Sequence, residues 1–385
     1  MNSPPEYDLV DSNSSSLHLS HPTPNERIKT WTTTAATWGD PDLIPLCLQR
    51  FQYLTTIPLA KNGGMTMWIL TDAKCLPDQR PILSSCETFR KRSLTSDAQG
   101  NTNDNMVYGI ASVFTPPRYR RRGYAARLMK ELANKLHSWQ SAAPTPCIGS
   151  ILYSDIGRRY YAKLGWHVNP TNSHYTFRPA RVPWPSRTEG ISKARLAELC
   201  ERDEIMIRNA MKCPRKGTKR RVTIIPDIDH MLWHIGKEEY MSELFLGKIP
   251  LLKGAITGPP GNQIWAIWTH CYYSHPEERL NENGLYILRL VVQNAEPTTD
   301  DANQPMDSFN AILQAAQYEA TEWKLDYITL WEPSLLVQGW IDGSGIEYAI
   351  TERKEEGIAS GMWYDANGSK IDPPLWINNE RYAYC

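Results

Sequence analysis

The residues best suited to chemistry begin where an apolar stretch runs into an arginine-rich turn. Residues 109–115 have the composition of a β-strand, a Pro-Pro pair follows, and Gly123 and Ala125 close the turn. Beyond the turn, apolar residues recur with helical spacing at Leu128, Met129, Leu132, Leu136 and Trp139. A helix that begins directly after such a turn exposes backbone N–H groups at its positive end. The sequence therefore predicts a phosphate site at this turn.

A second set of spaced residues follows a short apolar stretch at 148–153, which we interpret as a strand. Its members are Ser154, Gly157, Tyr161, Gly165 and Trp166. One alternative is that Tyr160 and Tyr161 are simply helix aromatics packed in a core. For the first set, the alternative is an ordinary basic turn between a strand and a helix. The turn matches neither the P-loop nor the dinucleotide-binding fingerprint.

Together, the two sets resemble motifs A and B of the GNAT superfamily of N-acetyltransferases. Arg120, Gly123 and Ala125 match motif A, Arg/Gln-x-x-Gly-x-Gly/Ala. The resemblance implies acetyl-CoA as co-substrate, with its pyrophosphate on the turn and Tyr161 protonating the departing CoA thiolate. The CoA-binding residues that it implies are Val113, Phe114, Thr115, Arg120, Arg121, Arg122, Gly123, Tyr124, Ala125, Ser154 and Tyr161. Ser154 departs from the family, which has asparagine in this position of motif B.

An amine acceptor with a pKa near ~10.4 must lose a proton before it attacks a thioester, so a base or a water chain is needed. Many GNAT members place a glutamate on the motif A strand, but the matching residue here is Gly109. Glu87 on the preceding predicted strand is therefore our candidate base and a candidate substrate-binding residue. The alternative is a solvated glutamate near Arg90 and Lys91.

The chain end supplies a second candidate base. Some two-domain relatives in the superfamily bring their terminal carboxylate into the first domain's site, which points to Cys385. The alternative is an aromatic tail, residues 379–385, that packs on the second half.

Transfer in this superfamily is direct, with a backbone N–H near Val113 or Phe114 facing the thioester oxygen. We therefore expect Cys86 to be a small buried thiol and not a nucleophile.

A polar cluster in the second half consists of Asp227, Asp229, His230 and His234, with the histidines at i, i+4 helical spacing. A metal site is not favoured, because there is no His-Glu-x-x-His pattern and no evident third ligand. We expect a helix face turned toward the substrate, with Asp229 and His234 as substrate-binding residues and no metal.

Composition narrows the class of partner. The 385 residues carry 42 basic and 42 acidic side chains, so no net charge favours nucleic acid or an anionic membrane. No stretch approaches the ~20 apolar residues of a membrane helix. Eight cysteines without a CxxC pattern and the lack of a secretory signal favour a cytoplasmic protein. The oligomeric state stays open.

The order of predicted elements indicates an α+β protein. We expect a flexible N-terminus at 1–16 and a GNAT domain at 17–180, in which a mixed central sheet is flanked by helices. Its elements are a first strand at 17–20, helices at 24–36 and 43–54, strands at 65–70, 82–90 and 109–115, a helix, a strand, a helix and a final strand pair at 166–177. A linker and helices follow at 181–225, including a helix at 191–211.

The second half, 226–385, repeats this outline, with strands, a helix at 307–323, a strand and a short helix. The loop at 294–301 is acidic and has no glycine, so it would repel a pyrophosphate. We expect a second GNAT-like domain that lacks the CoA motif. The alternative is an unrelated α+β domain.

Further stretches resemble the fungal lysine N-acetyltransferase family of lysine catabolism. They lie at 82–92, 152–157, 233–234, 285–292 and 379–385. The resemblance implies that the acceptor is a small-molecule amine, the ε-amine of free L-lysine. The alternatives are a secondary-metabolite amine, a protein lysine, and, in another class, an inactive CoA-binding regulatory protein.

Overall fold

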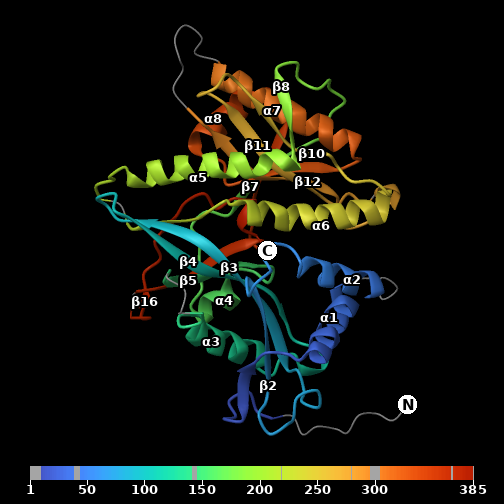
Figure 1. The fold of residues 1–385 in the computed structure, drawn as a ribbon, viewed down its shortest axis with the longest axis vertical. Coiled ribbons are helices and arrows are strands. Elements are labelled where there is room, and N and C mark those ends of the chain that lie inside the picture. The colour runs from blue at the N-terminus through green and yellow to red at the C-terminus, as the bar shows by residue number, and fades with distance from the viewer. Residues whose placement is uncertain are drawn as a thin grey trace.

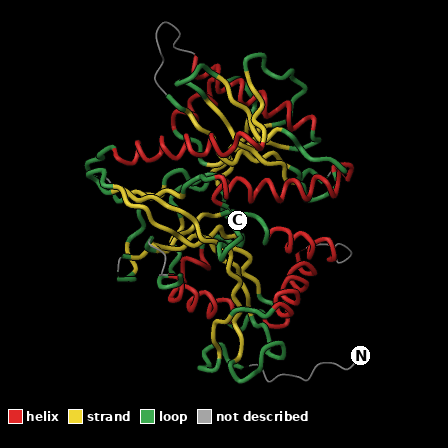
Figure 2. Tube along the Cα trace, in the orientation of Figure 1, coloured by secondary structure: helices red, strands yellow, loops and turns green. Residues whose placement is uncertain are grey.

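The computed structural model describes residues 10–38, 44–140, 145–217, 219–278, 280–294, 304–365 and 367–384. Within them, two mixed sheets lie one above the other, and Figure 2 shows two long helices between the two groups of strands. No helix in these ranges has both the length and the apolar character needed to cross a membrane.

The first sheet forms the lower lobe in Figure 1 and follows the order β1-β2-β3-β4-β5-β15-β16. The pairs along this path are antiparallel except β4 with β5, which is parallel, and β17 is also parallel to β9. Three short strands extend it, because β6 pairs with β15, β9 with β3, and β17 with β9. The strands are β1 (Leu17–Ser20), β2 (Met65–Asp72), β3 (Ser84–Ser96), β4 (Thr102–Phe114), β5 (Cys147–Ser154), β6 (His167–Val168), β9 (Arg221–Ile224), β15 (Ile358–Tyr364), β16 (Lys370–Ile371) and β17 (Leu375–Trp376).

The second sheet forms the upper lobe and follows the order β14-β7-β13-β12-β11-β10-β8. It also contains one parallel pair, β12 with β13, and a helix, α7, connects these two strands. The strands are β7 (Ser173–Phe177), β8 (Thr188–Ser192), β10 (Leu252–Thr257), β11 (Ile264–Cys271), β12 (Gly284–Val292), β13 (Tyr327–Trp331) and β14 (Tyr348–Glu352).

Helices cover the sheets in layers. The helices are α1 (Pro24–Trp38), α2 (Ile44–Leu54), α3 (Tyr124–Leu136), α4 (Arg159–Leu164), α5 (Leu196–Lys212), α6 (Ile228–Leu246), α7 (Gln304–Glu322) and α8 (Leu335–Gly343). Successive side chains of β4 point to opposite faces of the lower sheet, and helices cover both faces. Met106 and Tyr108 pack with α3 in one cluster, and Val107 packs with α5 and α6 in another. The second cluster also contains Trp265 and Leu288 of the upper sheet, so α5 and α6 lie between the sheets.

Strand exchange is the largest departure from the predicted organisation. The predicted hairpin at 166–177 is wrong, because β6 pairs with β15 whereas β7 joins the upper sheet beside β13. In return, β15 from the second half pairs with β5 along residues 358–363. The expected boundary at residue 180 therefore does not separate the two sheets.

Smaller departures concern lengths and ends. Strand β3 continues to Ser96, so the connection to β4 is shorter than expected, and the predicted helix at 191–211 begins only at Leu196. Residues 10–16, expected within a flexible terminus, pack on α3: the Tyr124 hydroxyl donates to the Val10 carbonyl at 2.6 Å. Residues 1–9 lie outside the described ranges.

Candidate active site

A cavity of about 1400 Å³ lies between the two lobes. Side chains from α1, α2, the middle of the lower sheet, α6, the upper sheet and the chain's tail line it. Strands β4 and β5 are paired with each other up to Ile110 and Leu152, where the ladder between these two strands ends. Just after this point Ser112 has a left-handed backbone with φ of 53°. The cavity therefore opens where the two parallel strands part.

Glu87 lies at this opening and lines the cavity. The Trp31 indole N–H of α1 donates to its carboxylate at 3.3 Å, and the Ser112 hydroxyl donates to it at 3.1 Å. Burial raises the pKa of the Glu87 carboxyl, against the two hydrogen bonds and the charge of Lys237, which lower it. A carboxylate with a raised pKa is a better proton acceptor, which suits a general base.

Tyr161 on α4 lines the same cavity from the other side of the opening. Its ring is buried and packs edge-on against Tyr160, with centroids 5.1 Å apart. Burial raises the pKa of the Tyr161 phenol, so the hydroxyl is protonated at neutral pH. No described residue forms a hydrogen bond with this hydroxyl that would compete with a ligand.

The Ser154 side chain is engaged within the chain. Its hydroxyl donates to the Gly157 carbonyl at 2.8 Å and accepts from the Ile156 N–H at 3.3 Å. These bonds shape the turn between β5 and α4, and the residue is buried. Ser154 therefore helps to position the helix that carries Tyr161.

The predicted phosphate turn has the backbone that its sequence requires. Gly123 precedes the first residue of α3 with φ of 85°, and Arg121 also has a positive φ, 62°. A Cβ on Gly123 would lie 2.7 Å from the Ser12 hydroxyl oxygen, so only glycine fits. Arg120, Arg121 and Arg122 are exposed, whereas Tyr124 is buried and Ala125 is half-buried. Exposed guanidinium groups beside a helix start suit a pyrophosphate.

The three residues before the turn differ in accessibility. Val113 lines the cavity, while Phe114 is buried. The Ser84 hydroxyl donates to the Phe114 carbonyl at 3.0 Å and lies 3.0 Å from the Thr115 hydroxyl. These contacts hold the end of β4 in place.

Cys86 is also buried, and burial raises the pKa of its thiol well above the usual value. A thiol that stays protonated is a poor nucleophile, which agrees with the expected non-nucleophilic role.

The acidic and histidine cluster of α6 is divided by the fold. His234 lines the cavity, but its Nε2 donates to the Tyr382 carbonyl at 3.1 Å, and burial lowers the pKa of its imidazole. His230 Nδ1 lies 2.7 Å from Asp227, whose carboxylate also caps α6. Asp229 is not among the cavity-lining residues. The i, i+4 histidines therefore hold the helix and the tail, and the described residues contain no group of three metal-ligating side chains.

The tail is fixed by buried charges that sequence reasoning did not identify. Arg289 of β12 forms ion pairs with Asp203 of α5, at 2.7 Å, and with Glu380. The buried Tyr382 hydroxyl donates to the Ile224 carbonyl at 2.7 Å. The tail consequently lies between the lobes, near the C label in Figure 1. Cys385, the second candidate base, lies outside the described residues.

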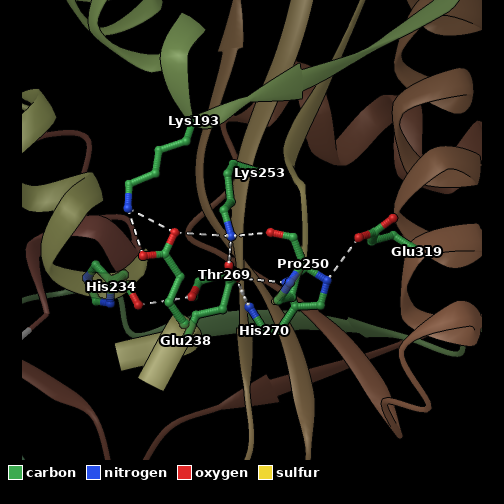
Figure 3. A network of polar contacts seen from close by, with 9 residues as sticks. Lys193, His234, Glu238, Pro250, Lys253, Thr269, His270 and Glu319 are labelled. Atoms are coloured by element: carbon green, nitrogen blue, oxygen red, sulfur yellow. Dashed lines mark hydrogen bonds and ion pairs between the residues drawn. The ribbon is translucent and has the colours of Figure 1, made fainter. Parts of the chain in front are cut away.

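A second missed network forms the upper wall beside α6 (Figure 3). Glu238 accepts from the His270 backbone N–H at 2.6 Å, lies 2.8 Å from His270 Nδ1, and pairs with Lys253. His270 Nε2 lies 3.1 Å from Glu319 of α7. Burial alone would lower the pKa of His270, but the two carboxylates raise it. The residues of this network are far apart in the sequence, so their spacing gives no indication that they meet.

Comparisons with known proteins agree with this architecture. Residues 174–385, more than half of the chain, match the family described as "LYC1 GNAT-like C-terminal domain". A lysine acetyltransferase of Yarrowia lipolytica is 23% identical over 258 residues, and the match covers 56% of this chain and 61% of that protein. The crystal structure of a GCN5-related N-acetyltransferase from Kribbella flavida has a TM-score of 0.50 at 13% identity, covering 91% of this chain and 72% of that one.

The structural likeness concerns the fold, and the family match extends over most of the upper lobe and the exchanged strands. Both agree with the resemblance stated from the two motifs. This chain therefore belongs to the GNAT superfamily, in the family defined by the LYC1 GNAT-like C-terminal domain.

Proposed function

We propose that the chain is an acetyl-CoA-dependent N-acetyltransferase that acts on a small-molecule amine. One observation supports this most directly: Glu87 and Tyr161 line the same cavity where β4 and β5 part. The turn with exposed arginines ends the same strand, β4, so a bound CoA can extend from the turn into the cavity. The family match and the name of the Yarrowia lipolytica relative point the same way.

In the proposed reaction the chain's residues move two protons. Glu87, with its raised pKa, accepts the proton that the acceptor ammonium loses, directly or through one water. The amine nitrogen then forms a bond to the acetyl carbon and loses its second proton to water as the carbon–sulfur bond breaks. Tyr161 donates its phenolic proton to the thiolate that leaves. The backbone N–H near Val113 or Phe114 stays our prediction for the donor to the thioester oxygen.

For the acceptor we propose the ε-amine of free L-lysine. Two features support a small acceptor: the cavity lies between the lobes, and its lining includes aromatic side chains such as Trp233 and Tyr286 that can enclose a methylene chain. The Yarrowia lipolytica relative is named a lysine acetyltransferase. Asp229, which does not line the cavity, is left out of this proposal.

An amine panel tests the proposal. The purified chain is incubated with acetyl-CoA and L-lysine, other diamines, secondary-metabolite amines and a lysine-containing peptide, and the products are read by mass spectrometry. The proposal requires acetylated L-lysine as the main product, with thiol release at the same rate. Acetylation of the peptide alone would contradict the small-molecule acceptor. Acetyl-CoA binding without any transfer would favour a regulatory protein.

A further inference from the structure

Arg381 in the tail lines the cavity and is surrounded by aromatic rings. Its guanidinium carbon lies 3.7 Å from the ring centroid of Tyr384 and 4.6 Å from those of Tyr286 and Trp331. These rings come from the tail, β12 and β13. We call Tyr286, Trp331 and Tyr384 the aromatic cage.

The charge inside this cage is not balanced by the described part of the chain, where no carboxylate forms an ion pair with Arg381. The neighbouring Arg289 provides the contrast, since it pairs with both Asp203 and Glu380. Arg353, whose guanidinium carbon lies 3.7 Å from the ring centroid of Trp331, also has a carboxylate partner, Glu332 at 3.7 Å, and donates to the carbonyls of Ser173 and Gly357. A partly desolvated cation without an anionic partner favours an anionic ligand.

The cage lies close to the point where β4 and β5 part. Tyr153 directly follows Leu152, the last residue of β5 that pairs with β4, and its ring lies 5.2 Å from Tyr384 and 6.0 Å from Trp331. Tyr153 also lines the cavity, together with Arg381, Glu87 and Tyr161. An acceptor whose anionic end contacts Arg381 and whose amine reaches the opening between β4 and β5 must be short.

Resting on the proposed acetyltransferase function, we propose that Arg381 binds a carboxylate of the acceptor. The acceptor is then an ω-amino carboxylic acid whose amine faces Glu87. The planar guanidinium can form two parallel hydrogen bonds with a carboxylate, and stacking on three rings holds it in one orientation. The rings also provide an apolar surface for the methylene chain between the two charged ends. Arg381 is in this view a specificity-determining residue.

A pair of acceptors that differ only in the carboxylate tests this assignment. L-lysine carries the group, and 1,5-diaminopentane has the same methylene chain and amine without it. We expect Arg381→Met to lower kcat/KM for L-lysine about 10²-fold, as loss of one partner of a buried charge pair does. The same variant should change kcat/KM for 1,5-diaminopentane less than about threefold. The kcat/KM of Arg381→Lys for L-lysine should lie between those of the parent and Arg381→Met, because lysine keeps the charge but cannot form two parallel hydrogen bonds with the carboxylate.

Arg202→Met is the matched control, because Arg202 also stacks on a ring, 4.9 Å from Trp265, but does not line the cavity. It should leave both rates unchanged. Equal losses for both acceptors in Arg381→Met would indicate a role in holding the tail and overturn the proposal, as would an unchanged rate with L-lysine. Calorimetric titration with acetyl-CoA checks that Arg381→Met is folded.

The experiments also distinguish failure of the proposed acetyltransferase function from failure of the carboxylate site at Arg381. If the parent chain acetylates neither amine, the small-molecule acceptor is wrong, and calorimetric titration with L-lysine still tests the carboxylate site. Binding by the parent that Arg381→Met loses would then support the site. Equal or absent binding in both would overturn it.

Discussion

Glu87 combines burial with two hydrogen-bond donors, and its raised pKa should appear in the pH dependence of the rate. Only the carboxylate form accepts a proton, so kcat/KM of the parent should rise as pH passes through this raised pKa. Glu87→Gln should lower kcat/KM at neutral pH by about 10²-fold or more. The remaining activity should rise only toward the amine's own pKa near ~10.4. Rate profiles from acidic to alkaline pH measure both effects.

Extension of the chain by a few glycines tests the other candidate base, the terminal carboxylate of Cys385, because it moves the carboxylate away from this residue. We expect the extended chain to lose less activity than Glu87→Gln. If extension abolishes turnover while Glu87→Gln keeps the parent profile, the base is the chain end. Full activity of both variants would assign proton removal to water.

Tyr161 is the second residue whose protonation state matters. Tyr161→Phe should lower kcat about 10²-fold, because it removes one positioned proton donor without changing the shape of the ring. Acetyl-CoA affinity, measured by calorimetry, should stay at the parent value. Tyr160→Phe is the control, since Tyr160 packs against Tyr161 but does not line the cavity. Unchanged kcat in Tyr161→Phe, with chemistry rate-limiting, would remove Tyr161 from the mechanism.

At the scale of an element, the start of α3 depends on one backbone conformation. Gly123→Val should raise KM for acetyl-CoA at least about tenfold, because a side chain is strained at φ of 85° and contacts Ser12. Steady-state kinetics with each substrate varied in turn should show little change in KM for the amine. Gly261→Val tests strain alone, since Gly261 has φ of 91° with open space around it. Equal effects of both variants would indicate a general loss of stability instead of a CoA site.

At the scale of the molecule, strand exchange ties the two lobes into one folding unit. A fragment of residues 1–180 lacks β9 and β15, which leaves one edge of β5 unpaired and β7 without its sheet. We expect this fragment to show no cooperative thermal transition by circular dichroism. Addition of the fragment 181–385 should restore a transition and acetyl-CoA binding. A cooperative transition and parent-like CoA affinity of fragment 1–180 alone would contradict the single unit.

Much of the fold follows from local pattern. The helices predicted at 24–36 and 43–54, the end of strand β4 and the helix after the arginine-rich turn lie close to where periodicity and cap residues predict them, although β4 begins seven residues before the predicted start at 109. The hairpin at 166–177 could not be predicted correctly, because local pattern does not encode which sheet a short strand joins. The partner of β5 is contributed by residues 358–363, about 200 positions away.

The candidate site divides in the same way. The sequence by itself determined the glycine turn at Gly123 and the place of Tyr161 on a short helix after a strand, because each depends on residues within a few positions of one another. Tertiary structure decided that Glu87 meets Tyr161 in one cavity, that His234 holds the tail, and that Arg381 stands within three rings. Those properties arise from desolvation and contact between residues of different elements, and neither is encoded in local spacing.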